Sequence, residues 1–296
     1  NTSFMHYDLL KKQCIIPVFA KDNESTISHS EFIDLMMESV NALFSAERIS
    51  TPVVAVSHPI KGRIPSAIGK SADELLEYEK TIYYERMAFT IEISSITETI
   101  NGNPLALSVG GVRAYNLENM RARKSPEKFK IFIGFQNKVC TNLCVSTDGF
   151  LSEARVMNLH DLFEQASEMI SGFNLRKNLD AMKALPEYGL SESQFAHMIG
   201  KAKMYQFLPA KDRNRIPLMP FTDSQVSTIA REYYGSRSFC RNSSGEIDLW
   251  RLYNLFTGAN KSSYIDNFLD RSVQCTDFVN MIKNVLETKS SNWYLN

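Results

Sequence analysis

EKFKIFIGFQNKVCTNLCVSTDGF, residues 127–150, carries the strongest strand pattern of the chain. Its first part alternates, which places successive side chains on opposite faces of a strand. One face is wholly apolar and is expected to be buried: Phe129, Ile131, Ile133 and Phe135. The other face is mixed, because one aromatic ring stands among polar residues: Lys128, Lys130, Phe132, Gln136 and Lys138.

The mixed face has two interpretations. An aromatic side chain between lysines suits single-stranded nucleic acid, since bases stack on the ring and phosphates meet the lysines. Alternatively, the lysine stems pack beside Phe132 under a helix, with their charged ends in water. The first interpretation predicts an exposed Phe132 and the second a buried one.

Strand and helix signals divide the chain near residue 150. Alternating runs at 87–94 and 105–109 flank the turn Asn101-Gly102, which predicts a hairpin. Together with the central stretch, this hairpin predicts an antiparallel sheet of three or four strands. Helical spacing predicts a helix at about 30–45 and several more after residue 150. We therefore expect an α+β fold, with a sheet from the N-terminal half packed against a helical C-terminal half that covers one of its faces. Residues 1–296 are expected to form a single compact unit, with a β-rich part at 1–150 and a helical part at 151–296.

Composition narrows the class of protein. Hydrophobic residues make up 44% of the chain, and 33 Lys and Arg balance 33 Asp and Glu, which excludes a strongly basic coat but permits a local patch. Five widely spaced cysteines favour a reducing compartment over a disulfide framework. No apolar run has membrane-spanning length and no signal peptide is visible, so a soluble cytoplasmic protein without a membrane partner is expected.

Basic residues interleaved with aromatics between 113 and 138 form the best candidate patch. Lys61 and Arg63 flank Gly62 in a segment that either holds an anion or is a solvated turn. Arg251, Asn254 and Lys261 form a second polar set, although neighbouring acids offer ordinary ion-pair partners. The predicted nucleic-acid contacts are Lys61, Arg63, Arg113, Arg121, Arg123, Lys128, Lys130, Phe132, Gln136, Lys138, Arg251 and Lys261.

No catalytic, metal or cofactor motif is recognisable. Cys140 and Cys144 do not form a C-x-x-C pair and are interpreted as core thiols. The segment 257–262 lacks the Gly-Lys pair of a phosphate-binding loop. A metal-dependent hydrolase requires clustered carboxylates, for which the candidates are Glu92, Glu98 and Asp148.

Several long segments carry a resemblance to known families: VSHPIKGRIP (56–65), EKTIYYERMAF (79–89), FIGFQNKVCTNLC (132–144), LWRLYNLFTGANKSSYIDNFLDRS (249–272) and the closing WYLN. Together they resemble an uncharacterised domain-of-unknown-function family of gut Bacteroidota, met on conjugative or phage-like elements. GFQNKVCTNL is more distantly similar to the phage/plasmid-like protein family. The resemblance implies an accessory protein of mobile DNA and supplies no catalytic residue.

Three function hypotheses follow. The first is a non-enzymatic protein that binds single-stranded nucleic acid. The second is a protein-binding accessory factor, either an inhibitor of host defence or an oligomeric scaffold, with a host protein or a second copy as partner. The third is the metal-dependent hydrolase.

Overall fold

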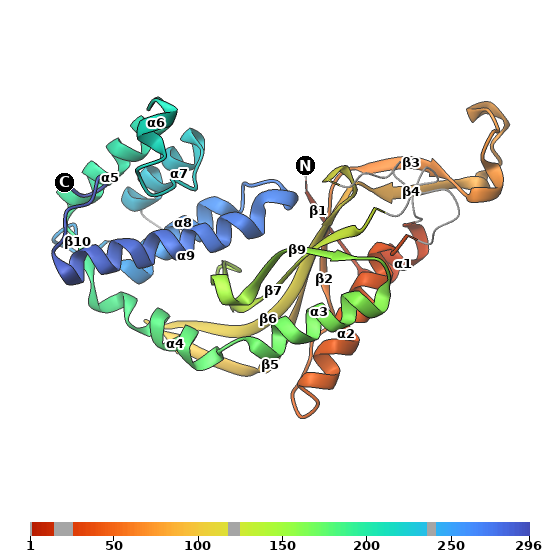
Figure 1. The fold of residues 1–296 in the computed structure, drawn as a ribbon, viewed down its shortest axis with the longest axis horizontal. Coiled ribbons are helices and arrows are strands. Elements are labelled where there is room, and N and C mark those ends of the chain that lie inside the picture. Colours follow the sequence, from red (N-terminus) through yellow and green to blue (C-terminus); the bar gives the residue numbers. More distant parts are fainter. Residues whose placement is uncertain (1, 15–25, 118–124, 236–240) are drawn as a thin grey trace.

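The computed structural model describes residues 2–14, 26–117, 125–235 and 241–296. A seven-stranded antiparallel sheet lies at its centre, with strand order β1-β2-β5-β6-β7-β8 and β9 also paired with β7 (Figure 1). Most of the sheet comes from the first half of the chain and most helices from the second, so the predicted α+β fold is confirmed. The sheet is wider than the three or four strands expected, because short strands add to both of its edges. Its strands are β1 (Ser3–Met5), β2 (Val53–Val56), β5 (Arg86–Ile100), β6 (Asn103–Ala114), β7 (Glu127–Asn137), β8 (Leu143–Cys144) and β9 (Phe150–Val156).

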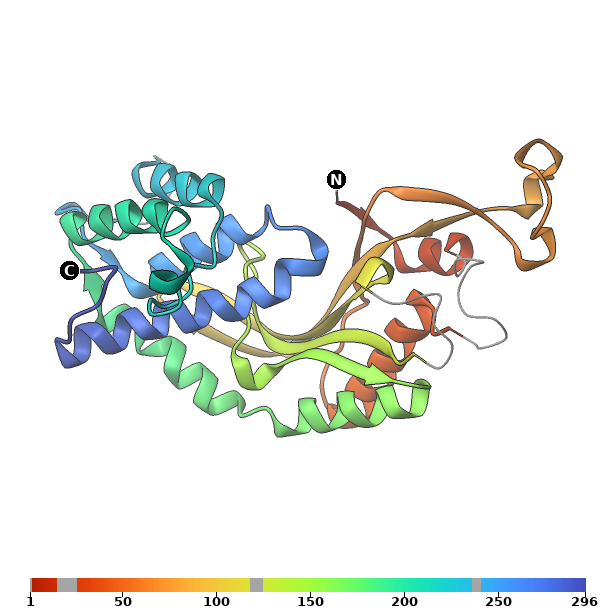
Figure 2. The ribbon, with the colours of Figure 1, turned by 45° about the horizontal axis from the view of Figure 1, so that its top comes forward.

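The helices lie on both faces of the sheet and at one of its ends (Figures 1 and 2). Two other strand pairs stand apart, β3 (Pro59–Arg63) with β4 (Lys80–Tyr84) and β10 (Gly189–Leu190) with β11 (Ile247–Asp248). The α-helices are α1 (Tyr7–Gln13), α2 (His29–Leu43), α3 (Leu159–Gly172), α4 (Leu175–Lys183), α5 (Glu192–Tyr205), α6 (Ala210–Arg213), α7 (Asp223–Tyr234), α8 (Leu249–Asn260) and α9 (Ile265–Thr288). Within the described ranges, no helix combines the length and apolarity needed to cross a membrane.

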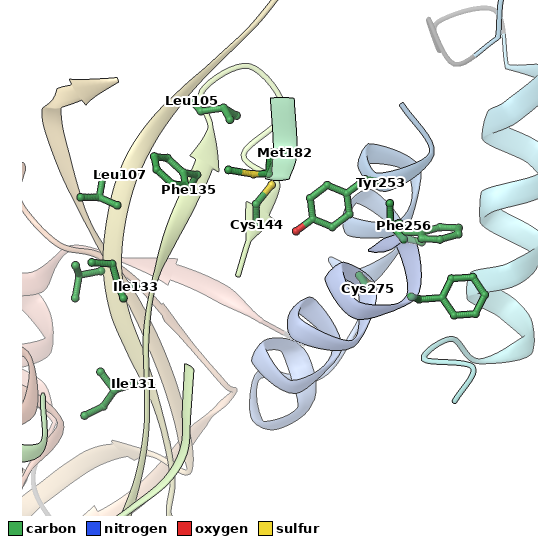
Figure 3. Packing of buried hydrophobic residues seen from close by; sticks show 14 of the residues in the cluster. Leu105, Leu107, Ile131, Ile133, Phe135, Cys144, Met182, Tyr253, Phe256 and Cys275 are labelled. Atoms are coloured by element: carbon green, nitrogen blue, oxygen red, sulfur yellow. The ribbon is translucent and has the colours of Figure 1, made fainter. Parts of the chain in front are cut away.

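The apolar face of β7 is buried as predicted, and α2 covers part of it. The Phe32 ring on α2 meets Phe129 at 4.7 Å and Phe89 at 5.0 Å between centroids, both in edge-on geometry. A capping box at Ser28 and Glu31 fixes where α2 begins. Farther along the same face, Phe135 and Cys144 lie close to Tyr253 from α8 (Figure 3).

The middle of the mixed face of β7 is also buried, while Lys138 beyond it is exposed, which differs from the expectation that helices cover only one face. Phe132 packs in a second cluster with Leu269 and Val273 of α9 and is 2% exposed. Lys130 beside it donates a hydrogen bond to the Asp266 carbonyl at 2.7 Å and pairs with Asp270. The covering of Phe132 by a helix is therefore confirmed, although Lys130 pairs with Asp270 of α9 instead of ending in water, and the prediction of an exposed stacking ring is wrong. Sequence alternation does not reveal this, because the covering helix lies far along the chain.

A two-stranded arm leaves the sheet between β2 and β5. Strands β3 and β4 form it, and three short 3-10 turns, η1 (Pro65–Ala67), η2 (Ala72–Glu74) and η3 (Glu77–Glu79), form its tip. Figures 1 and 2 show the arm at one end of the molecule and helices α5–α7 at the other.

Candidate functional site

A cleft of about 780 Å³ lies where the sheet meets the helical end. Its walls come from four places that are distant in sequence. They are the β5–β6 turn at 101–103, the loop that follows β7, and helix α8, with α7 contributing Thr228 and Glu232. We call it the asparagine cleft, because four of the residues that line it are Asn101, Asn103, Asn142 and Asn254.

Asn137, at the end of β7, organises the loop at 138–142. Its side-chain oxygen accepts from the backbone N–H groups of Val139 (2.9 Å) and Cys140 (3.3 Å). Its amide nitrogen donates to Asn103 at 3.1 Å and to Asn254 at 3.4 Å. One buried amide thus joins the loop, the hairpin turn and α8, which fixes the shape of the cleft floor.

Thr141 in this loop has φ +57°, in the left-handed region that β-branched residues rarely adopt. Its N–H donates to the Asn137 carbonyl at 2.8 Å, which holds the turn closed. Backbone strain of this kind costs of order 1–3 kcal/mol and is concentrated at functional sites. The loop conformation is therefore maintained by its surroundings rather than by local preference.

Two buried polar atoms beside the cleft lack a hydrogen-bond partner, one in the loop that follows β7 and one on α8. The Asn142 nitrogen donates to the Asn254 carbonyl at 3.0 Å, whereas its oxygen Oδ1 is buried without a hydrogen bond. Trp250 Nε1 is likewise buried and unpartnered. Both atoms are enclosed by the protein, so they do not face the cleft, and they leave two buried polar groups unsatisfied beside its wall.

Two cations of the second predicted set lie in the cleft wall. Arg251 pairs with Asp248 at 3.2 Å, and Lys261 donates to the Cys140 carbonyl. Glu232 on α7 adds one acid to the lining. Gly258 keeps the wall open, since a Cβ there would face the Asn142 amide at 3.9 Å. The cleft therefore offers amide donors and acceptors beside one cation paired with Asp248, a second cation at Lys261 and one acid at Glu232.

Only part of the predicted contact set gathers at this cleft. Gln136 donates to the Thr141 carbonyl at 3.4 Å, and Lys138 extends from the same loop to Glu92 at 3.0 Å. Lys128, at the other end of β7, pairs with Glu153 at 2.5 Å.

The prediction that Arg113 contacts nucleic acid is wrong. It is fully buried, pairs with Glu127 and donates to the Ile27 carbonyl, so it is not available to a polyanion in the folded protein. Its guanidinium also lies over the rings of Phe129 (4.4 Å) and Tyr115 (4.8 Å).

Lys61 and Arg63 belong to strand β3 of the arm, away from the cleft, rather than to an open loop. Lys61 is exposed, and Arg63 donates to the Lys70 carbonyl. Arg121 and Arg123 lie outside the described residues.

The carboxylates of the hydrolase hypothesis do not converge. Glu92 pairs with Lys138, Glu98 pairs with Lys183 on α4, and Asp148 accepts from Ser146 and Asn178. Among the residues described, no group of three His, Cys, Asp or Glu side chains is arranged to hold a metal.

The thiols divide between core and cleft. Cys144 is buried, as expected, and burial raises its pKa to about 12. Cys140 is half-buried and lines the cleft, with its sulfur 3.8 Å from the Asn254 oxygen, so its interpretation as a core thiol is wrong.

The geometry defines an α+β protein whose sheet and helical end enclose an asparagine-lined cleft. The sequence offers one signal for this site: two of the segments quoted above, at 132–144 and 249–272, supply its floor and its main wall. Residues 1–295 match the family model described as "Domain of unknown function, B. Theta Gene description (DUF3871)", and the chain belongs to that family. No curated protein and no solved structure matches the chain.

Proposed function

We propose that the protein is a non-enzymatic nucleic-acid-binding accessory protein of a mobile genetic element, and that it acts in the cytoplasm. Its site in this proposal is the asparagine cleft rather than the β7 face. The observation that carries the proposal is that the side chains of four asparagines line one cleft together with Arg251 and Lys261. The cysteines that lie in the described part of the chain, at 14, 140, 144 and 275, form no disulfide, which fits a reducing compartment.

Nucleotides match both features of the cleft. Amide side chains offer a donor and an acceptor together, which is the pattern that base edges present. In a single strand those edges are free to be read, and cations meet the phosphates. A volume of about 780 Å³ lies within the usual range for small-ligand sites, about 300–1,000 Å³, so the cleft admits a nucleotide or a short strand end.

The first prediction is weak but salt-dependent binding of a labelled single-stranded oligonucleotide, measured by fluorescence anisotropy. Two phosphate contacts give a slope of log K against log salt of about −1.4, or about sevenfold weaker binding between 50 and 200 mM salt. Arg251→Gln and Lys261→Gln should each weaken binding about tenfold, since a hydrogen bond to a charged group contributes about 1.5 kcal/mol.

Gly258→Met tests the cleft itself, because it adds a side chain toward Asn142 without removing a polar contact. Gly200→Met on α5 is the matched control, since a Cβ there meets nothing within 4 Å. Lys128→Gln is the control for loss of charge at the other end of β7. Binding that survives Gly258→Met, or that is lost equally in Lys128→Gln, would contradict this location, and no binding at low salt would contradict the proposed ligand.

The second candidate function is a protein-binding accessory factor. Large apolar side chains at the arm tip are exposed, and exposed apolar groups of this kind mark interaction sites.

A further inference from the structure

The tip of the β3–β4 arm, residues 64–79, is an ordered structure that presents apolar side chains to solvent. Arg63 donates to the Lys70 carbonyl, Lys70 pairs with Glu79 at 2.5 Å, and a capping box at Ser71 and Glu74 shapes the turn between them. This frame holds three large side chains outward: Ile68, Leu76 and Tyr78, the last 73% exposed. Holding them there has no stabilising effect on the monomer, since nothing covers them.

The arm tip is also acidic. It contains one lysine and four carboxylates, of which Glu79 is held by Lys70 and Glu77 by Lys80. Asp73 and Glu74 are exposed at the surface. An acidic surface around apolar side chains disfavours a nucleic-acid strand and favours a partner that is both apolar and basic.

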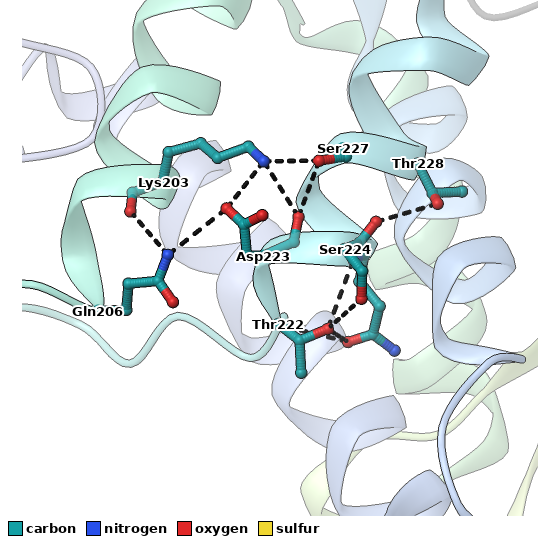
Figure 4. Close-up of polar contacts among 8 residues, drawn as sticks. Lys203, Gln206, Thr222, Asp223, Ser224, Ser227 and Thr228 are labelled. Carbon is teal, nitrogen blue, oxygen red and sulfur yellow. Dashed lines mark hydrogen bonds and ion pairs between the residues drawn. The ribbon is translucent and has the colours of Figure 1, made fainter.

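The same chain carries such a surface at its other end. Residues 204–218, from the end of α5 through α6, expose Met204, Phe207 and Leu218, with Phe207 81% exposed. We call this the basic apolar surface, because Lys211, Arg213 and Arg215 are exposed beside these side chains and Asp212 is its only acid. Lys203 nearby is already neutralised by Asp223 on α7, as Figure 4 shows, and does not add to this charge.

The two surfaces lie at opposite ends of the long axis of the molecule (Figures 1 and 2), so one copy does not join its own ends. We propose that the chain associates head to tail with a second copy, with the arm tip of one copy bound to the basic apolar surface of the next. Opposite charge and shared apolar character support this pairing. A contact between two different surfaces is heterologous and continues into rings or filaments. The cleft takes no part in this contact, so the inference is independent of the proposed nucleic-acid binding, whereas it deepens the second candidate function, which rests on the same arm tip.

The test is the mass of the protein in solution, measured by light scattering from about 5 to about 200 µM, since association follows concentration. The mass of the wild type should rise with concentration beyond that of a dimer, and the rise should shrink in high salt because exposed charges are screened. Tyr78→Ser and Phe207→Ser, both at exposed positions, should each stay monomeric. An equimolar mixture of the two variants should stop at twice the mass of one chain, because it retains one intact tip and one intact surface.

Leu159→Ser, at an exposed apolar position on α3, is the control and should associate as the wild type does. A wild type that stays monomeric throughout would overturn the proposal and leave both surfaces to partners of other sequence. Association that survives either variant, or a mixture that stays monomeric, would overturn the head-to-tail pairing.

Discussion

His29 is a buried neutral imidazole whose protonation opposes folding. Its Nε2–H donates to the Tyr84 carbonyl at 2.8 Å, and its ring lies 4.6 Å from that of Tyr115. Burial, together with the positive charge of Arg113, lowers its pKa to about 3. In the unfolded chain a histidine has a pKa of about 6.5. Between these values the unfolded state binds the extra proton, so stability is present above about pH 6.5 and is lost as the pH falls.

We predict that the free energy of unfolding decreases by about 1.4 kcal/mol per pH unit below pH 6.5 through this residue alone. Urea unfolding of wild type and His29→Gln between pH 7.5 and 5 measures it, since the variant should lose this part of the slope. His160→Gln is the control, because His160 is exposed and contacts Glu164 at 3.3 Å on the surface. Equal slopes for wild type and His29→Gln would show that His29 is not the titrating group.

For single residues, the sequence indicates chemical character better than it indicates the surroundings in which the side chain lies. Arg113 was counted in a basic patch because its neighbours in sequence are basic, yet its strand is buried on both faces and Glu127 pairs with it. Asn142 and Asn254 are ordinary amides in the sequence. Their shared cleft arises only from a contact across 112 positions of the chain. A pattern in a short stretch of sequence therefore predicts the exposure of a residue poorly where the residue that covers it lies far away in the chain.

Strand β6 depends on two adjacent glycines that allow both layers of the molecule to approach the sheet. A Cβ on Gly110 would lie 2.1 Å from the Phe89 carbonyl and 2.7 Å from the Phe132 ring. On Gly111 it would lie 2.5 Å from the Phe32 ring on α2 and 2.7 Å from the Lys130 carbonyl. Glycine inside a strand marks a bend or a close approach, and the close approach of aromatic rings is what the structure contains here.

We predict that Gly110→Ala and Gly111→Ala each lower the free energy of unfolding by about 1–3 kcal/mol, because overpacking displaces a ring or a strand. Gly200→Ala is the matched control. It lies within α5 with open space around it and should raise stability by up to about 1 kcal/mol. Thermal unfolding of the three variants measures both the expected loss of stability in β6 and the expected gain in α5. Destabilisation of all three by the same amount would mean that steric crowding at β6 is not the cause.

The sequence predicts individual helices and strands more reliably than it predicts which of them pack together. The hairpin across Asn101-Gly102, the helix predicted at about 30–45 and the alternation of β7 side chains between two faces all follow from local periodicity and are confirmed. What covers each face does not follow, because Lys130 on β7 meets Asp270 on α9 at a separation of 140 residues. The segment around Lys61, Gly62 and Arg63 is predicted as an anion-binding segment or a solvated turn, whereas the structure pairs it as strand β3 with β4.

For the whole molecule, we propose that sheet and helical end unfold as one cooperative unit. Helix α9 packs on the sheet through Phe132, Leu269 and Val273, and α8 packs on it through Tyr253. The side chain of Thr276 also donates to the Val145 carbonyl at 2.6 Å. An apolar interface that is buried from both sides couples two parts more strongly than the polar contacts typical of separate domains.

Two probes report on the two parts separately. Trp250 and Trp293, the chain's 2 tryptophans, both lie in the helical part, so their fluorescence follows it, whereas hydrogen exchange of the β6 amides follows the sheet. We predict coincident urea midpoints for the two probes. Phe132→Ala should lower both midpoints together by removing about 3–5 kcal/mol of packing, since this ring joins the two parts. Ile68→Ala at the exposed arm tip is the control and should leave both in place. If Phe132→Ala shifted only one probe, the two parts would be separate domains that touch, and the cleft between them would open without global unfolding.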